Sequence, residues 1–163
     1  MLLWWVLSLF ACVSTPAFVT YMSDLNASTP PLLARQLGFA GLIPFVALSL
    51  AVWAQDPDAA DALVAYAATI TSFLGAIHWG LAMREPQPDA QSLLWGVVPS
   101  LVAWLALMIE TDGALAMLAA LLVTCWLVDR RMYPRWGLEA WMTLRTPLTL
   151  VASLSCALSA WLY

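Results

Sequence analysis

Charge is scarce in this chain of 163 residues, because only 10% of its residues are charged and its six cationic side chains are all arginines. Hydrophobic residues make up 63%, whereas soluble domains are roughly 45 to 50% apolar and about 25% charged. A soluble domain of this size cannot bury so much apolar surface. The composition therefore excludes a soluble enzyme, a nucleic-acid-binding protein and a disordered chain, each of which needs a polar surface.

Long uncharged runs predict an all-α polytopic membrane bundle, since a helix needs about 20 apolar residues to cross a bilayer. We expect five core transmembrane helices in residues 35–163, and an N-terminal sixth helix with a short loop in residues 1–34. A cleaved signal peptide is the alternative for the first run, but positive charge and an A-x-A site are both missing there. The runs cover residues 1–22, 36–54, 62–83, 92–109, 114–128 and 146–163.

The arginines predict the orientation of the bundle. All six fall in the segments 23–35, 84–91 and 129–145, and the alternate loops have none. Short cytoplasmic loops carry the excess of positive charge, so we expect these three segments in the cytoplasm and both termini on the periplasmic side. No acidic residue falls within a predicted span, and we therefore expect no intramembrane carboxylate relay.

Glycines and prolines repeat at the start of two predicted helices. Gly41-Leu-Ile-Pro44 and Gly96-Val-Val-Pro99 share the pattern Gly-x-x-Pro, which indicates either a duplicated hairpin or two local kinks with close helix contacts. In the third span, Ala68, Ser72 and Gly75 form a stripe of small residues at helical spacing. This face, which His78 shares in part, is expected to point into the bundle.

His78 is the only histidine, and it is the only ionisable side chain other than tyrosine in a predicted span. Such residues are costly in a membrane and are candidates for function; the alternative is a structural histidine. In either case we expect it to face inward and to bond to the helix of Gly41–Pro44 or of Gly96–Ser100, with Trp79 turned toward the interface. The full candidate ligand or packing site, mapped to the cytoplasmic half, is His78, Trp79, Arg84, Gly41, Pro44, Trp95, Gly96, Pro99, Arg130 and Arg131.

The sequence carries no recognisable catalytic pattern. H-E-x-x-H, G-x-S-x-G and phosphate-binding glycine loops are missing, and Cys12, Cys125 and Cys156 have no metal-binding spacing. A single histidine also excludes bis-histidine haem ligation within one chain. We therefore expect no enzyme activity, no metal and no cofactor.

Two functions remain open for such a chain. The first is an accessory or assembly subunit of a larger membrane complex, because little of the chain lies outside the spans. The alternative is a small binder or transporter of an amphipathic anion, such as a quinone precursor, a porphyrin or a lipid, at a cytoplasmic-side pocket lined by His78 and Arg84. The expected partners are the lipid bilayer and a membrane protein or a second copy of the chain, and not nucleic acid.

Four motifs in order carry a resemblance to a known family: the runs Leu37–Phe45, Ser72–Gly80, Leu94–Ser100 and Asp129–Arg131. Over about residues 35–160 they resemble the uncharacterised family of small multi-span membrane proteins called domain of unknown function 3429, which includes mitochondrial transmembrane protein 69 and many proteobacterial proteins. The resemblance implies an inner-membrane protein and no known activity. With no mitochondrial presequence visible, a bacterial inner (plasma) membrane is expected.

The topology can be tested by cysteine-accessibility labelling at Asp58 and Asp89. Because the loop of Asp58 has no arginine and that of Asp89 lies in an arginine-bearing segment, we expect reagents to reach the two positions from opposite sides of the membrane. Labelling of both from the same side would contradict the topology.

Overall fold

The computed structural model describes residues 30–163, which form helices and contain no strand in that range. The expected all-α bundle is therefore confirmed, whereas the predicted N-terminal helix at residues 1–22, Cys12 and residues 23–29 of the predicted loop lie outside the described residues. The rest of that loop was predicted wrongly, because α3 begins at Leu32 and contains Arg35. The helices are α3 (Leu32–Ala40), α4 (Ile43–Trp53), α5 (Ala59–Ala82), α6 (Ala90–Ala106), α7 (Thr111–Met132) and α8 (Met142–Leu162), with the short 3₁₀ helices η1 (Tyr133–Trp136) and η2 (Glu139–Trp141).

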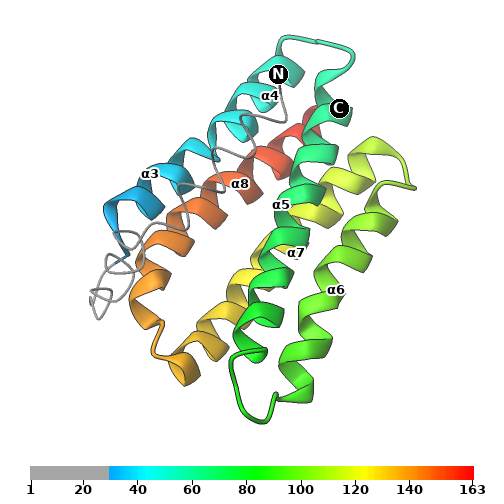
Figure 1. Ribbon diagram of the computed structural model, residues 1–163. Coiled ribbons are helices and arrows are strands. Elements are labelled where there is room, and N and C mark those ends of the chain that lie inside the picture. Colours follow the sequence, from blue (N-terminus) through cyan, green and yellow to red (C-terminus); the bar gives the residue numbers. More distant parts are fainter. Residues whose placement is uncertain (1–29) are drawn as a thin grey trace, which may run out of the picture.

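The helices form five antiparallel rods, since α3 and α4 follow one another along a single rod (Figure 1). Three segments are long and apolar enough to cross a membrane: Leu32–Trp53, Ala59–Ala82 and Thr111–Trp136. The apolar helix α6 is shorter, and α8 has 21 residues. The rod of α3 and α4 is interrupted at Gly41 and Leu42, and Pro44 lies in the first turn of α4, where its missing N–H is not needed.

The connection between α7 and α8 is shorter than the sequence predicted. The expected loop at residues 129–145 shrinks to η1 and η2, because α7 continues to Met132 and α8 already begins at Met142. Asp129 and Arg145 thus lie inside helices, and both are buried. The expectation that no acidic residue lies in a span is wrong, because a carboxylate can be buried within a bundle when a cation pairs with it.

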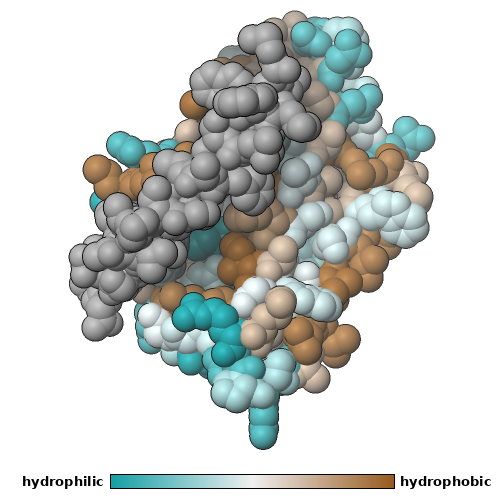
Figure 2. Space-filling model, viewed as in Figure 1, coloured by the Kyte–Doolittle hydropathy of each residue, from teal (hydrophilic) through white to brown (hydrophobic). Residues whose placement is uncertain are grey.

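The connections alternate between the two ends of the bundle. At one end, Arg135 of η1 lies 3.9 Å from Asp89 at the start of α6. At the other end, the Thr111 hydroxyl of α7 donates a 2.7 Å hydrogen bond to Asp61 of α5. Hydrophilic side chains gather toward these ends, and hydrophobic ones cover much of the surface between them (Figure 2). The arginine-bearing segments after α5 and α7 therefore share one end, as their arginines predicted.

Helices α5 and α6 meet at a seam of small residues. A Cβ atom at Gly75 would lie 2.8 Å from the Gly96 carbonyl oxygen and 3.0 Å from the Pro99 ring. One at Gly96 would lie 3.2 Å from the backbone nitrogen of Trp79. The predicted close approach at Gly75 is therefore present, and together with the buried Thr71 it places this face of α5 in the interior.

The close contact at the seam predicts that alanine substitutions at two glycines of α5 have different effects on stability. Gly75→Ala should lower the free energy of unfolding by about 1–3 kcal/mol, because the added methyl group overpacks the contact with α6. Gly80→Ala is the matched control, since a Cβ atom there meets nothing within 4 Å. Reversible unfolding in mixed micelles would measure both; equal stability of the two variants would contradict the close contact.

Candidate functional site

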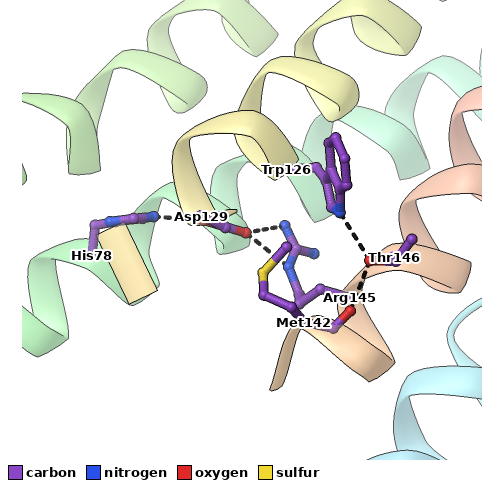
Figure 3. Close-up of polar contacts among 6 residues, drawn as sticks. All are labelled: His78, Trp126, Asp129, Met142, Arg145 and Thr146. Atoms are coloured by element: carbon purple, nitrogen blue, oxygen red, sulfur yellow. Dashed lines mark hydrogen bonds and ion pairs between the residues drawn. The ribbon is translucent and has the colours of Figure 1, made fainter. Parts of the chain in front are cut away.

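Three ionisable side chains from three helices meet inside the bundle. The Asp129 carboxylate of α7 lies between His78 of α5 and Arg145 of α8 (Figure 3). His78 Nε2 is 2.7 Å from Asp129 Oδ1, and Arg145 Nε donates to Asp129 Oδ2 at 2.8 Å. Arg145 Nη2 also donates to Oδ2. Since the exposed fractions of His78 and Asp129 are 0% and 2%, this cluster is an intramembrane polar network of the kind that marks functional sites.

The periodicity of α7 places Asp129 in the interior. The buried residues Leu115, Leu118, Leu122 and Cys125 precede it at alternating spacings of three and four, which keep side chains on one helix face. Asp129 continues this series by one more step of four. The Asp129 side chain therefore points the same way as the apolar face of α7, into the bundle.

The same periodicity holds for α8. Arg145, Thr149, Ala152, Cys156 and Ser159 follow one another at spacings of four and three, and all are buried. The small side chains let α8 pack closely against its neighbours. Arg145 thus enters the interior at the first turn of this buried face.

The charges of the cluster balance when His78 is neutral. One guanidinium group then faces one carboxylate, and the Nε2–H tautomer of His78 donates to the carboxylate oxygen that Arg145 leaves free. The other ring nitrogen, Nδ1, is buried and has no hydrogen-bond partner in the described part of the chain. The imidazole ring also packs against Tyr133 and Trp136 of η1, with ring centroids 6.1 and 5.7 Å away.

A second polar link joins α7 and α8 beside the cluster. Trp126 Nε1 donates to the Thr146 hydroxyl at 3.1 Å, and that hydroxyl donates to the Met142 carbonyl at 2.8 Å (Figure 3). The two links hold the ends of these helices together across the short η1–η2 connection.

A groove of about 580 Å³ opens between the α3–α4 rod, α5 and α8. Its wall is almost entirely apolar, and among the described residues Arg145 is the only charged one in it. Thr149 also lines the groove, is 6% exposed, and has no hydrogen-bond partner for its hydroxyl among the described residues. The apolar wall includes Ala34, Leu37, Phe45, Ile70, Leu74, Ile77, Leu148 and Ala152.

A smaller polar pocket of about 330 Å³ lies at the arginine-rich end. Arg84, Arg135 and Glu85 line it. Leu81 of α5 and Leu138 between η1 and η2 line both this pocket and the apolar groove. The two cavities therefore adjoin, with Leu81 and Leu138 between them, so that a charged pocket, the mouth, lies beside an apolar groove.

The residues of the predicted site fall in three places. Trp79, Gly96 and Pro99 meet at the α5–α6 seam, with Trp95 half-buried on α6 beside them. On the other side of α5, Gly41 lines the apolar groove, with Pro44 three residues further along its rod. At the arginine-rich end, Arg84 lines the polar pocket, whereas Arg130 and Arg131 are exposed and line neither cavity.

The prediction that the His78 side chain faces inward is correct, but the predicted hydrogen-bond partner is wrong. The side chain faces inward, and Trp79 is turned outward with 42% of its surface exposed. Its hydrogen-bond partner is Asp129 of α7, and not a group of the α4 or α6 helix as expected. The predicted pocket lined jointly by His78 and Arg84 is also not formed, because His78 lines neither cavity.

Sequence reasoning missed several residues of the charged cluster and the groove, above all Asp129, Arg145 and Thr149. The signal for Asp129 and Arg145 was their phase, since both continue the buried faces of their helices. Treating every charged residue as the end of a span concealed that signal. For Thr149 no signal exists, because a threonine in an apolar helix usually bonds to its own backbone.

Comparison with known proteins identifies the family of the chain. A family model described as a protein of unknown function, DUF3429, matches residues 30–161. The chain belongs to this family. It is also 39% identical over 137 residues to transmembrane protein 69 of Xenopus tropicalis, an alignment that covers 76% of the chain and 54% of that protein. Transmembrane protein 69 of Mus musculus is 33% identical over 96 residues, which cover 55% of the chain and 37% of the relative.

The family membership confirms the resemblance that the four motifs carry. It also confirms that the chain is a membrane protein of unknown function. The chain spans about half the length of the Xenopus relative, 54%. No solved structure matches the chain.

The cluster predicts strong coupling between Asp129 and Arg145. Asp129→Leu should lower the free energy of unfolding by about 3–5 kcal/mol, because it leaves the guanidinium buried and unpaired. The double variant Asp129→Leu/Arg145→Met should recover most of that loss, since no unpaired charge remains. A double-mutant cycle measured by unfolding in mixed micelles would show the coupling; additive losses would contradict it.

Proposed function

We propose that the protein is a membrane-embedded binding protein for an amphipathic anion. The apolar part of the ligand occupies the groove, and its anionic head group binds in the arginine-lined pocket. The observation that carries this proposal is that Leu81 and Leu138 line both cavities, which places the arginine-lined pocket directly beside the apolar groove. The proposal assigns binding to the protein, without a catalytic step.

The apolar groove has the dimensions and the lining of a small-molecule site. Its volume of about 580 Å³ lies within the range of roughly 300–1,000 Å³ that such sites have. Few polar groups interrupt the apolar wall; among them Arg145 and Thr149 lie one helical turn apart on α8, and Tyr133 of η1 also lines the groove. This combination favours a ligand that is mostly hydrocarbon.

The charged pocket favours an anion at the head of that ligand. The guanidinium groups of Arg84 and Arg135 and the carboxylate of Glu85 line it; Arg135 pairs with Asp89 at 3.9 Å, whereas Arg84 has no ion pair within residues 30–163. Arginine binds phosphate and carboxylate groups through paired hydrogen bonds. Basic pockets at the ends of membrane helices suit the head groups of anionic lipids.

The distribution of arginines supports a location for this site. We propose that the arginine-rich end faces the cytoplasm of a bacterial inner membrane, with the C-terminus on the periplasmic side. The anionic head would then come from the cytoplasmic leaflet, and the apolar groove would run from there toward the membrane interior.

A role as an accessory or assembly subunit is the second candidate. The connections between the described helices are short, so most of the surface available to a partner protein is helix flank. Large apolar side chains are exposed on these flanks, among them Trp104, Leu101 and Leu158. Exposed apolar residues of this kind suit contact with another membrane protein as well as with lipid.

Blocking the apolar groove tests the binding proposal. Ala34→Trp places a large side chain in the groove wall, and we expect it to remove most of the anionic lipid that the full chain retains in mild detergent. Ala120→Trp is the matched control, because Ala120 is exposed on α7 and lines neither cavity. Native mass analysis of the three proteins would count the bound lipids.

The same measurement separates the two candidates. Equal lipid retention by wild type and by Ala34→Trp would contradict a ligand in the groove. A stoichiometric protein partner, lost from neither variant, would favour the accessory role.

A further inference from the structure

Thr149 differs from the other threonines in the helices. The hydroxyls of Thr71, Thr124 and Thr146 each donate to the carbonyl four residues earlier, at 2.9, 2.8 and 2.8 Å. The Thr149 hydroxyl makes no hydrogen bond within residues 30–163, although the residue is only 6% exposed and lines the groove. Buried polar groups have partners in nearly all proteins. The structure therefore leaves the buried hydroxyl group of a groove-lining residue without a partner among the described residues.

A second donor lies next to this hydroxyl group. Arg145 precedes Thr149 by four residues on the same face of α8 and also lines the groove. Its Nε and Nη2 atoms bond to Asp129, and the Tyr133 side chain, which also lines the groove, interacts with the same guanidinium group. Two donors at one level of an apolar groove favour a ligand with an oxygen acceptor at that level.

The electrostatics of the cluster favour an uncharged acceptor. Asp129 already neutralises Arg145, so an anion bound at this level would add an uncompensated charge to a region of low dielectric constant. A carbonyl oxygen would accept the available hydrogen bonds without that cost. The charged part of the ligand belongs instead at the arginine-rich mouth.

Three chemical environments thus follow one another along the site. Two arginines line the mouth, Arg145 and Thr149 form the donor pair in the adjoining groove, and hydrocarbon side chains line the rest of the groove. A glycerophospholipid has the same order, with a phosphate, then ester carbonyls, then acyl chains. The residues of the three environments are Arg84 and Arg135, then Arg145 and Thr149, then Phe45, Ile70, Leu74 and Ala152.

We propose that the ligand is a glycerophospholipid, and that Arg145 and Thr149 bind one of its ester carbonyl groups. This inference rests on the proposed function and names the class of its ligand. Hydrocarbon chains gain little by moving from the bilayer into an apolar groove, because lipid tails are as apolar as leucine. Selection of a ligand from the membrane therefore depends on the polar contacts, and the carbonyl contact is the most deeply buried of them.

The test compares an ester lipid with its ether analogue. Phosphatidylglycerol with ester-linked chains and the diether of the same head group and chain length differ only in the carbonyl groups. The full chain in detergent, titrated with each lipid and analysed by native mass spectrometry, should bind the ester lipid about 3- to 10-fold more tightly, which is the effect of a net hydrogen bond.

Two variants assign the preference to the donor pair. Thr149→Val keeps the shape of the side chain and removes the hydroxyl group, so we expect the preference for the ester lipid to fall toward unity. Thr124→Val is the matched control, since Thr124 is exposed on α7 and bonds to its own helix; its preference should match that of the wild type. Unfolding midpoints would confirm that both variants fold, and if Thr149→Val does not, the ester-to-ether ratio of the wild type decides alone.

The outcomes separate this inference from the proposed function. Equal binding of ester and ether lipids, both still reduced by Ala34→Trp, would overturn the carbonyl site and leave the binding of an amphipathic anion intact. Binding of neither lipid would overturn both. Inorganic phosphate at matched concentration should not displace the lipid; displacement would show that the mouth binds a free anion and would also overturn the inference.

Discussion

One carboxylate holds three helices of this bundle together. Asp129 of α7 accepts hydrogen bonds from His78 of α5 and from Arg145 of α8, so each of its oxygens serves a different helix. In a low-dielectric interior the carboxylate and the guanidinium need one another, because either alone would be a buried and unpaired charge. The relative positions of α5, α7 and α8 therefore depend on this contact. So does the groove, since Arg145 is part of its wall.

Much of the fold could be predicted from the sequence, because the cost of exposing backbone and charge to lipid limits where the helices can be. The uncharged runs located every core rod, and the arginines predicted which connections share an end, as the contact between Arg135 and Asp89 confirms. The helix ends were less predictable. The runs ended at Val128 and began again at Thr146, but paired charges extend both helices toward each other.

The candidate site was predictable only in part. His78 faces the interior, as the small-residue face of α5 indicated, and the close approach at Gly75 is present. The partner of His78 is 51 residues away in the sequence, and no local pattern pairs the two. The groove and the free hydroxyl group of Thr149 depend on how side chains from four segments fill space, which a single sequence does not encode in any short motif.

The break at Gly41 and Leu42 has a further consequence for how the proposed ligand would enter. Helix α3 buries no residue, yet it supplies one wall of the groove through Ala34 and Leu37. Local opening costs least where few buried contacts are lost, so displacing α3 costs less free energy than displacing any helix whose face lies in the core. The break lies where the Tyr66 hydroxyl of α5 donates to the Gly41 carbonyl, so α3 would bend away from that point while α4 remains packed on α5 and α8. A lipid could then pass sideways from the bilayer into the groove without any change in the charged cluster behind it.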